Sequence, residues 1–188
     1  TQRVEPASVD RMAYPLPEKP SIAVLPFKNF SGDAQQEYFS DGLTEEIITA
    51  LSKLPQLFVI ARNSSFTYKG KTVKIQQVSE ELGVRYVLEG SVRKANDQIR
   101  ITAQFIDAIT GRHLWAERYD REHKDLFAVE DDVAQKVVSE LAVTLKVTEQ
   151  ERLFRRHTEN LEAYETFLQA RRALDATMED TMQAKKLF

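Results

Sequence analysis

The spacing of hydrophobic residues changes along the first third of the chain, and these changes predict strands and a helix. Residues 21–27 are apolar almost throughout, which is typical of a strand buried on both faces of a sheet, and Pro26 marks its end. From Asp33 to Pro55 the apolar spacing is helical, with a capping box expected at the start. Residues 57–61 predict a second strand, so the unit implies parallel pairing through a right-handed crossover.

The middle of the chain predicts a short helix and then an antiparallel meander. Ile75, Val78 and Leu82 share one helix face, and Gly83 stands where a helix C-terminal cap is expected. After this helix, polar and apolar residues alternate in three runs, which are residues 85–93, 99–105 and 114–119. The pair Asn96-Asp97 is a tight-turn sequence between the first two runs. Alternation predicts strands with one face exposed to water.

A helical period returns at Leu126, where Val129, Val133 and Val137 form one stripe that continues to Leu145. The predicted order is therefore β-α-β-α-β-β-β-α. The fold class is α/β, a mixed sheet covered by helices and followed by a C-terminal helical hairpin.

The sequence divides into four predicted parts. Residues 1–20 end in three closely spaced prolines and predict a Pro-rich linker, while residues 21–145 form the α/β domain. Residues 146–160 predict a charged connector, and residues 161–188 predict the beginning of a helical repeat that needs a neighbour to cover its apolar face. Because the chain starts at Thr1 and stops inside this hairpin, we interpret it as a piece of a larger protein.

Composition excludes several classes of protein. The 188 residues include no cysteine, so disulfides and zinc–thiolate sites are impossible, and the formal net charge is only −3. The longest apolar run, residues 22–27, is far shorter than a membrane-spanning helix requires. We expect no membrane contact within these residues. The compartment stays open, because a cysteine-free chain suits the cytoplasm or the periplasm.

No arrangement of reactive residues predicts catalysis. The three histidines lack the spacing of a metal pair, and the six glycines form no phosphate-binding or dinucleotide-binding loop. Glu45-Glu46 and Asp131-Asp132 are neighbours on predicted helices, so their carboxylates point about 100° apart and do not converge. We therefore predict no catalytic residues, no metal and no cofactor.

Polar residues follow the two predicted parallel strands, where ligands of open α/β sheets often bind. Lys28 and Asn29 follow the first strand, and Arg62, Asn63 and Ser64 follow the second. These five residues are candidates for contact with an anion or another small ligand. The alternative is that Asn and Ser cap turns and that Arg62 pairs with a helix carboxylate.

The loop at residues 62–74 contains basic and aromatic side chains but no acid, a combination that also occurs in nucleic-acid-binding surfaces. Acidic side chains nevertheless outnumber basic ones between residues 21 and 145, and four basic groups make a weak phosphate contact. We expect no direct binding of nucleic acid. Phe66 and Tyr68 are expected to hold the loop against the domain.

Several long segments together resemble a known family. They are KPSIAVLPF (19–27), YFSDGLTEEI (38–47), FVIARNSSFTYKG (58–70), LGVRYVLEGSVR (82–93) and LWAERYD (114–120). They are similar to the TolB amino-terminal-like domain of bacterial multidomain proteins, particularly those with a class III adenylate cyclase domain upstream and tetratricopeptide repeats downstream. The hairpin from residue 161 looks like a first such repeat, although Ala170 stands where glycine is usual.

The resemblance implies a regulatory or interaction module without catalytic residues of its own. It would couple an effector domain, a nucleotide cyclase, to protein or peptide partners held by the repeats. Three alternatives stay open: a small-anion or nucleotide sensor, the signalling module of a winged-helix transcriptional regulator, and an envelope-assembly lipoprotein relative of TolB. The exposed apolar stripe of the hairpin also suggests a homo-oligomer.

Overall fold

The computed structural model describes residues 4–122, 126–140 and 166. A six-stranded sheet runs in the order β3-β1-β4-β5-β6, and β2 pairs with β4 beside this path. The strands are β1 (Ser21–Val24), β2 (Lys28–Asn29), β3 (Phe58–Val59), β4 (Tyr86–Ala95), β5 (Gln98–Asp107) and β6 (Arg112–Glu122). Strands β1, β2 and β3 are parallel to their partners, whereas β4, β5 and β6 are antiparallel. The predicted mixed sheet is confirmed.

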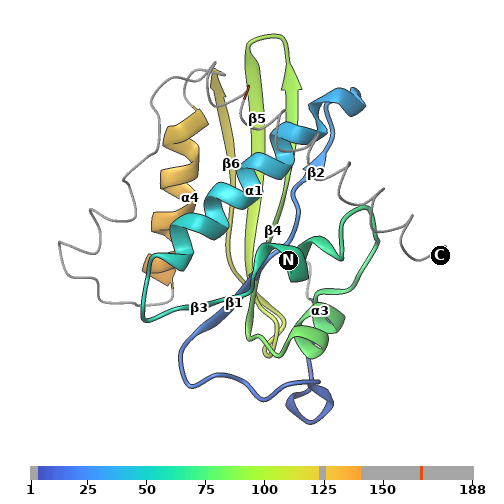
Figure 1. Cartoon of the computed structure of the whole chain (residues 1–188), viewed down its shortest axis with the longest axis vertical. Helices are drawn as coiled ribbons and strands as arrows, with labels where there is room; N and C mark the ends of the chain where they lie inside the picture. Colours follow the sequence, from blue (N-terminus) through green and yellow to red (C-terminus); the bar gives the residue numbers. More distant parts are fainter. Residues whose placement is uncertain (1–3, 123–125, 141–165, 167–188) are drawn as a thin grey trace, which may run out of the picture.

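Helices cover both faces of the sheet. The α-helices are α1 (Glu37–Ser52), α2 (Arg62–Phe66), α3 (Ile75–Leu82) and α4 (Leu126–Glu140), and 3-10 turns occur at Val9–Arg11 and Ala34–Gln36. Helices α1 and α4 lie next to each other on one face, as Figure 1 shows. Helix α3, residues of the loop before it and the N-terminal residues pack on the other face, while Phe66 of α2 packs against the core on the α1 side. The domain therefore has two hydrophobic cores separated by the sheet.

The strand β1 explains why two cores form. All four of its residues are buried, because Ile22 and Val24 point to the α1 side while Ala23 points to the α3 side. A strand between two layers must be apolar on both faces, which is the pattern seen in the sequence. Strand β4 lies between β1 and β5 and carries Val87 and Leu88 into opposite cores.

Most predicted helix signals are present, with two differences. Gly83 caps α3 with a φ of 64°, as predicted, and Val129, Val133 and Val137 are buried on α4. The expected capping box is absent at α1, since a 3-10 turn follows Asp33 and the α-helix begins at Glu37 without a side-chain cap. The segment predicted as a polar loop after β3 also forms the short helix α2 in its first five residues.

The predicted connector at 146–160 and nearly all of the hairpin at 161–188 lie outside the described residues. The end of the stripe at Leu145 also falls there. No helix among the described residues is long and apolar enough to cross a lipid bilayer.

Gly90 marks the closest approach of β4 to its neighbours. An added Cβ at this position would lie 2.4 Å from the Thr102 carbonyl oxygen and 2.5 Å from the Phe27 ring. We expect Gly90→Ala to destabilise the domain by about 1–3 kcal/mol, the usual cost of overpacking a dense core. Urea unfolding of the 188-residue chain measures this cost. An unchanged midpoint and slope would show that β4 has room for a methyl group.

Candidate functional site

The five residues predicted to contact a ligand do not form one cluster. Arg62 begins α2 and pairs with Glu45 of α1, with 2.6 Å between Arg62 Nε and Glu45 Oε2. Its guanidinium also lies 4.1 Å from the centre of the Phe66 ring. The alternative interpretation of Arg62, a pair with a helix carboxylate, is therefore the geometry observed.

The other predicted contact residues serve local structure or lie apart. Asn29 accepts a hydrogen bond from the Ser31 backbone N–H and donates one to the Asp33 carbonyl oxygen, so it shapes the turn after β2. Asn63 and Ser64 are exposed on α2, and the Ser64 carbonyl accepts a hydrogen bond from the Thr67 hydroxyl. Lys28 is exposed on β2.

Ion pairs hold the α2–α3 loop to α1. Lys69 bonds to Asp41 and lies 3.4 Å from Glu37. Burial raises the pKa of the Asp41 carboxyl above its usual value, and the hydrogen bond and charge of Lys69 oppose this rise. Tyr68 is buried and donates a hydrogen bond to Glu81. Two neighbouring residues near the start of the loop therefore anchor it, Lys69 to α1 and Tyr68 to α3, and Tyr68 holds it to the domain as predicted.

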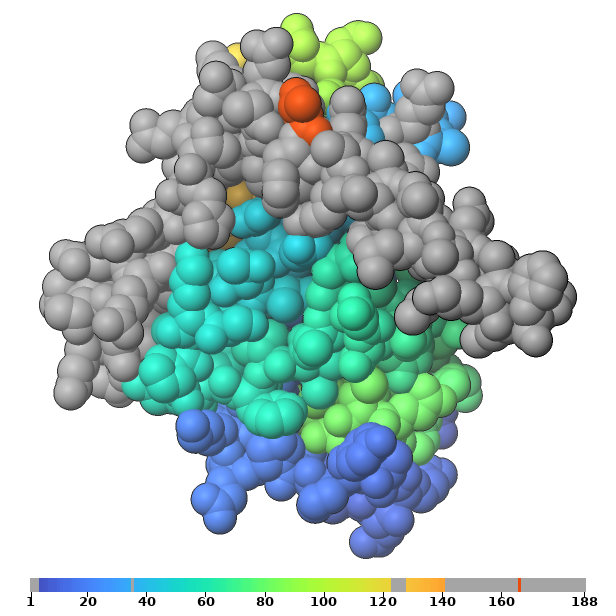
Figure 2. All heavy atoms as spheres, in the orientation of Figure 1, coloured from blue at the N-terminus to red at the C-terminus, as the bar shows by residue number. Residues whose placement is uncertain are grey.

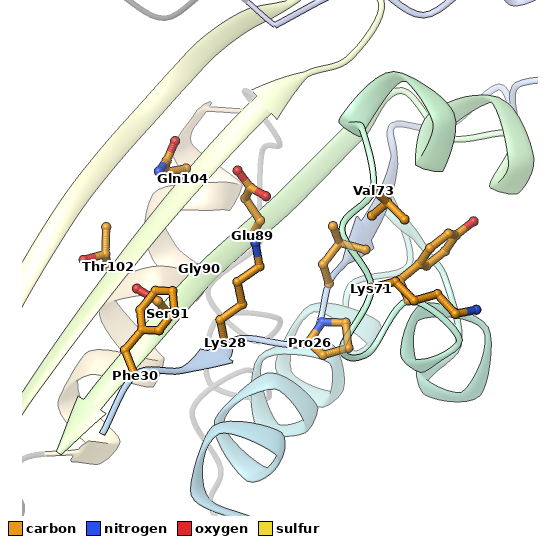
Figure 3. A pocket seen from close by; sticks show the side chains of 12 residues that line it. Pro26, Lys28, Phe30, Lys71, Val73, Glu89, Gly90, Ser91, Thr102 and Gln104 are labelled. Atoms are coloured by element: carbon orange, nitrogen blue, oxygen red, sulfur yellow. The ribbon is translucent and has the colours of Figure 1, made fainter. Parts of the chain in front are cut away.

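A pocket of about 180 Å³ lies between this loop and the sheet. Its floor is formed by β4 and β5, and its walls are formed by residues around β2 and by the α2–α3 loop. Figure 3 shows the polar side chains on the floor and Lys28 running toward Glu89. The lining residues are Leu25, Pro26, Lys28, Phe30, Tyr68, Lys71, Val73, Glu89, Gly90, Ser91, Thr102 and Gln104. Among the predicted contact residues, Lys28 belongs to this pocket.

Sequence reasoning missed the polar floor because its residues belong to alternating strands. Glu89 and Ser91 on β4, and Thr102 and Gln104 on β5, occupy the positions that the alternation assigns to a wetted face. The α2–α3 loop folds over part of this face, and no local pattern in the sequence indicates that contact. The alternating pattern was the signal available, and it indicated exposure to solvent rather than a pocket wall.

A second feature is the attachment of the N-terminal segment, which we define as residues 4–16. The predicted linker includes these residues, and they pack on the domain beside α3 at the bottom of Figures 1 and 2. The backbone N–H groups of Val4 and Ala7 donate to the carbonyl oxygens of Gly111 and Ala108, at 3.3 and 2.7 Å. Ala7 is buried in the core on the α3 side of the sheet.

Glu80 of α3 is the main polar contact of this segment. Its carboxylate accepts a hydrogen bond of 2.8 Å from the Ser8 backbone N–H and pairs with Arg11 at 2.9 Å, while its carbonyl oxygen accepts one from Ala13 N–H. The Ser8 hydrogen bond is the largest influence that lowers the pKa of Glu80, and Gln76 and Arg11 lower it further. The ionised carboxylate is therefore the form that holds the segment.

Glycines allow the same segment to approach closely. Gly111 has a φ of 67°, and an added Cβ would lie 2.1 Å from the Val4 carbonyl oxygen. At Gly83, with a φ of 64°, an added Cβ would lie 2.7 Å from the Tyr14 carbonyl oxygen. Gly70 has a similar φ of 71° but nothing within 4 Å of an added Cβ. A Gly70→Ala variant therefore separates the effect of backbone strain from the effect of losing the N-terminal contact.

No group of three or more possible metal-ligating side chains is present within residues 4–122 and 126–140. The described geometry thus offers a small polar pocket and an attached N-terminal segment as its two candidate functional features.

Comparison with known proteins gives a relative of high identity. A protein of Rhizobium meliloti (strain 1021) named "Putative adenylate cyclase 3" is 58% identical over 174 residues, which cover 92% of this chain. The chain spans about 30% of the length of that relative. The expected resemblance to part of a protein named as an adenylate cyclase is therefore confirmed.

Similar solved structures include TolB from Acinetobacter baumannii, at 19% identity and a TM-score of 0.44 over 68% of this chain and 30% of that chain. The lipoprotein GNA1162 from Neisseria meningitidis is also 19% identical, with a TM-score of 0.44 over 67% of this chain and 99% of that chain.

The hold of Glu80 on the N-terminal segment predicts a specific titration. A carboxylate whose pKa is lower in the folded state stabilises the contact above its usual pKa, and the contact is lost as the pH falls through the lowered value. We expect the Ser8 backbone amide resonance to titrate with a midpoint below 4.5, the ordinary value for glutamate. Nuclear magnetic resonance measures the shift. Glu80→Gln should abolish this titration, and a midpoint at or above the ordinary value would contradict the hydrogen bond.

The close approach at Gly111 predicts a second result. Gly111→Ala should displace the N-terminal segment and increase amide hydrogen exchange of residues 4–13 by about tenfold or more, since about 1.4 kcal/mol of lost contact corresponds to that factor. Gly70→Ala introduces a similar backbone strain without the contact and should leave this exchange unchanged. Equal protection in both variants would show that the segment tolerates a methyl group at Gly111.

The match to a protein family covers most of the described domain. Residues 18–140 match the family described as the HilA/YgeH-like transcriptional regulator, second domain. This stretch contains the strands of the described sheet and the helices α1 to α4. The chain belongs to the family of the second domain of HilA/YgeH-like transcriptional regulators.

Proposed function

We propose that the α/β domain is a noncatalytic regulatory module that couples an effector domain of a longer protein to its partners. The observation that carries this proposal is the attachment of the N-terminal segment to the domain by Glu80, Ala108 and Gly111. These contacts join the incoming chain to both α3 and the β5–β6 connection. These contacts are therefore the route by which a conformational change in the domain reaches the effector domain in this proposal.

The comparisons support a module that serves different outputs. The family is named for transcriptional regulators, whereas the Rhizobium meliloti relative is named as an adenylate cyclase and is about three times longer than the shared part. In this proposal the effector of the present chain is a nucleotide cyclase. The helical repeat proposed for residues 161–188 supplies the protein-binding or peptide-binding side, and pairing of two such repeats supplies a homo-oligomer.

Coupling between the two ends of the domain requires at least two conformational states of the domain that differ in free energy. A ligand or partner changes output only if it binds one of these states more tightly. In this proposal the N-terminal segment has two states, attached and released, and its hydrogen bonds to Glu80 and Ala108 are made in the attached state. The sheet between the two cores provides a rigid body against which the attachment acts.

A domain exchange tests the proposal. The part of this chain that aligns with the Rhizobium meliloti protein would replace the matching 174-residue segment of that protein. The rate of cyclic AMP formation by the purified hybrid would then be measured. We expect the hybrid to retain activity, and Gly111→Ala to change its rate about fivefold or more, which corresponds to a coupling of about 1 kcal/mol. Gly70→Ala is the matched control.

The outcomes separate the parts of the proposal. Equal rates for the hybrid and both glycine variants would remove the regulatory role of the attached segment. A Rhizobium meliloti protein that makes no cyclic AMP would contradict the cyclase-coupled form.

A second candidate, the signalling domain of a transcriptional regulator, is favoured by the family match. A hybrid with a winged-helix DNA-binding domain and a promoter reporter distinguishes it. This candidate is selected if Gly111→Ala changes expression of the reporter and leaves the rate of the cyclase hybrid unchanged.

A further inference from the structure

The pocket between the α2–α3 loop and the sheet contains polar groups that lack protein partners. Among the described residues, no hydrogen bond or ion pair within 4.0 Å involves the side chains of Lys28, Glu89, Ser91, Thr102 or Gln104. All except Lys28 are half-buried. Their hydrogen-bonding groups are not used within the part of the protein that the structure describes, so this floor is suited to a polar occupant that replaces water.

The strand register places these groups in two rows. Lys28 pairs with Ser91 across β2 and β4, and Ser91 pairs with Thr102 across β4 and β5. Directly paired residues share a sheet face, so these three side chains form one row with a spacing of about 4.8 Å between strands. Glu89 and Gln104 are paired in the next row of the same face, about 7 Å away along the strands.

The pocket presents the Lys28 ammonium and the Glu89 carboxylate without a direct ion pair between them. Figure 3 shows the Lys28 side chain running toward Glu89, while the Lys71 ammonium points away from both. Lys28 and Glu89 form no ion pair within 4.0 Å. A molecule that carries both an anionic and a cationic group can therefore pair its anionic group with Lys28 and its cationic group with Glu89.

The size of the pocket limits the ligand. Its volume of about 180 Å³ is smaller than the roughly 300–1,000 Å³ that is common for pockets of drug-sized ligands or cofactors. The space therefore favours a ligand smaller than a nucleotide. The hydroxyls and the amide of Ser91, Thr102 and Gln104 also favour a polar side chain on the ligand over a purely apolar one.

From this geometry we propose that the pocket binds a small free amino acid with a polar side chain. Its α-carboxylate binds Lys28, and its α-ammonium binds Glu89. Its side chain donates to or accepts from Ser91, Thr102 and Gln104, and Phe30 and Val73 line the apolar edge. This proposal concerns binding alone and stands independently of the regulatory role proposed above.

Isothermal titration calorimetry tests the proposal on the 188-residue chain, with each of the proteinogenic amino acids used separately. We expect saturable binding of at least one polar amino acid. Its N-acetyl derivative lacks the ammonium and its amide derivative lacks the carboxylate, so each should bind about tenfold more weakly, as expected for loss of one charge-assisted hydrogen bond.

Two variants assign the charges to residues. Glu89→Gln should remove most of the tenfold preference for the free amino acid over its N-acetyl derivative, and Lys28→Met should remove most of the preference over its amide. Lys136→Met and Glu140→Gln are matched controls, because both residues are exposed on α4, which packs on the other face of the sheet. Both controls should keep both preferences.

Circular dichroism and urea unfolding confirm that each variant is folded before binding is compared. Absence of saturable heat with every amino acid would overturn the proposal and leave the pocket as a water-filled site. Binding with unchanged preferences in Glu89→Gln and Lys28→Met would also overturn it, because the ligand would then occupy another place on the chain.

Discussion

Strand β4 is paired along both of its edges, and the rest of the structure depends on this pairing. Parallel hydrogen bonding to β1 and β2 joins it to the first half of the chain, and antiparallel pairing to β5 joins it to the meander. The absence of a side chain at Gly90 lets Phe27 and the β5 backbone come close to the strand. The same strand also supplies Glu89 and Ser91 to the pocket floor, so the packing of the core and the geometry of the pocket are linked.

The short break between β1 and β2 gives the pocket its wall. Thr44 of α1 accepts a hydrogen bond from the Phe27 backbone N–H, which ties the break between the two strands to α1. The chain then pairs with β4 again at Lys28. Pro26 and Lys28 line the pocket on this side and the α2–α3 loop lines it on the other, around the floor residues of β4 and β5. Ion pairs from Lys69 to α1 hold that loop in place.

The two candidate features share one continuous piece of chain. The α2–α3 loop forms a pocket wall, and α3, which follows it, holds the N-terminal segment through Glu80. Tyr68 in the wall donates to Glu81, the neighbour of Glu80 on α3. The pocket wall and the hold on the N-terminal segment are therefore joined by a buried side chain within one packed unit.

The sequence by itself determined the fold class, the buried strand β1, the meander and the helix stripes, because periodicity of apolar residues reports local burial directly. The second apolar run, residues 57–61, forms only the short edge strand β3, in which Phe58 is 46% exposed. It also placed Gly83 at a helix end, where a positive φ favours glycine. Only the tertiary structure decided that Arg62 pairs with Glu45, that Lys28 faces Glu89, and that residues predicted as a linker pack against Glu80. These contacts join residues that are far apart in the chain. They form only when packed helices and strands bring the residues together, and the local spacing of apolar residues does not encode that packing.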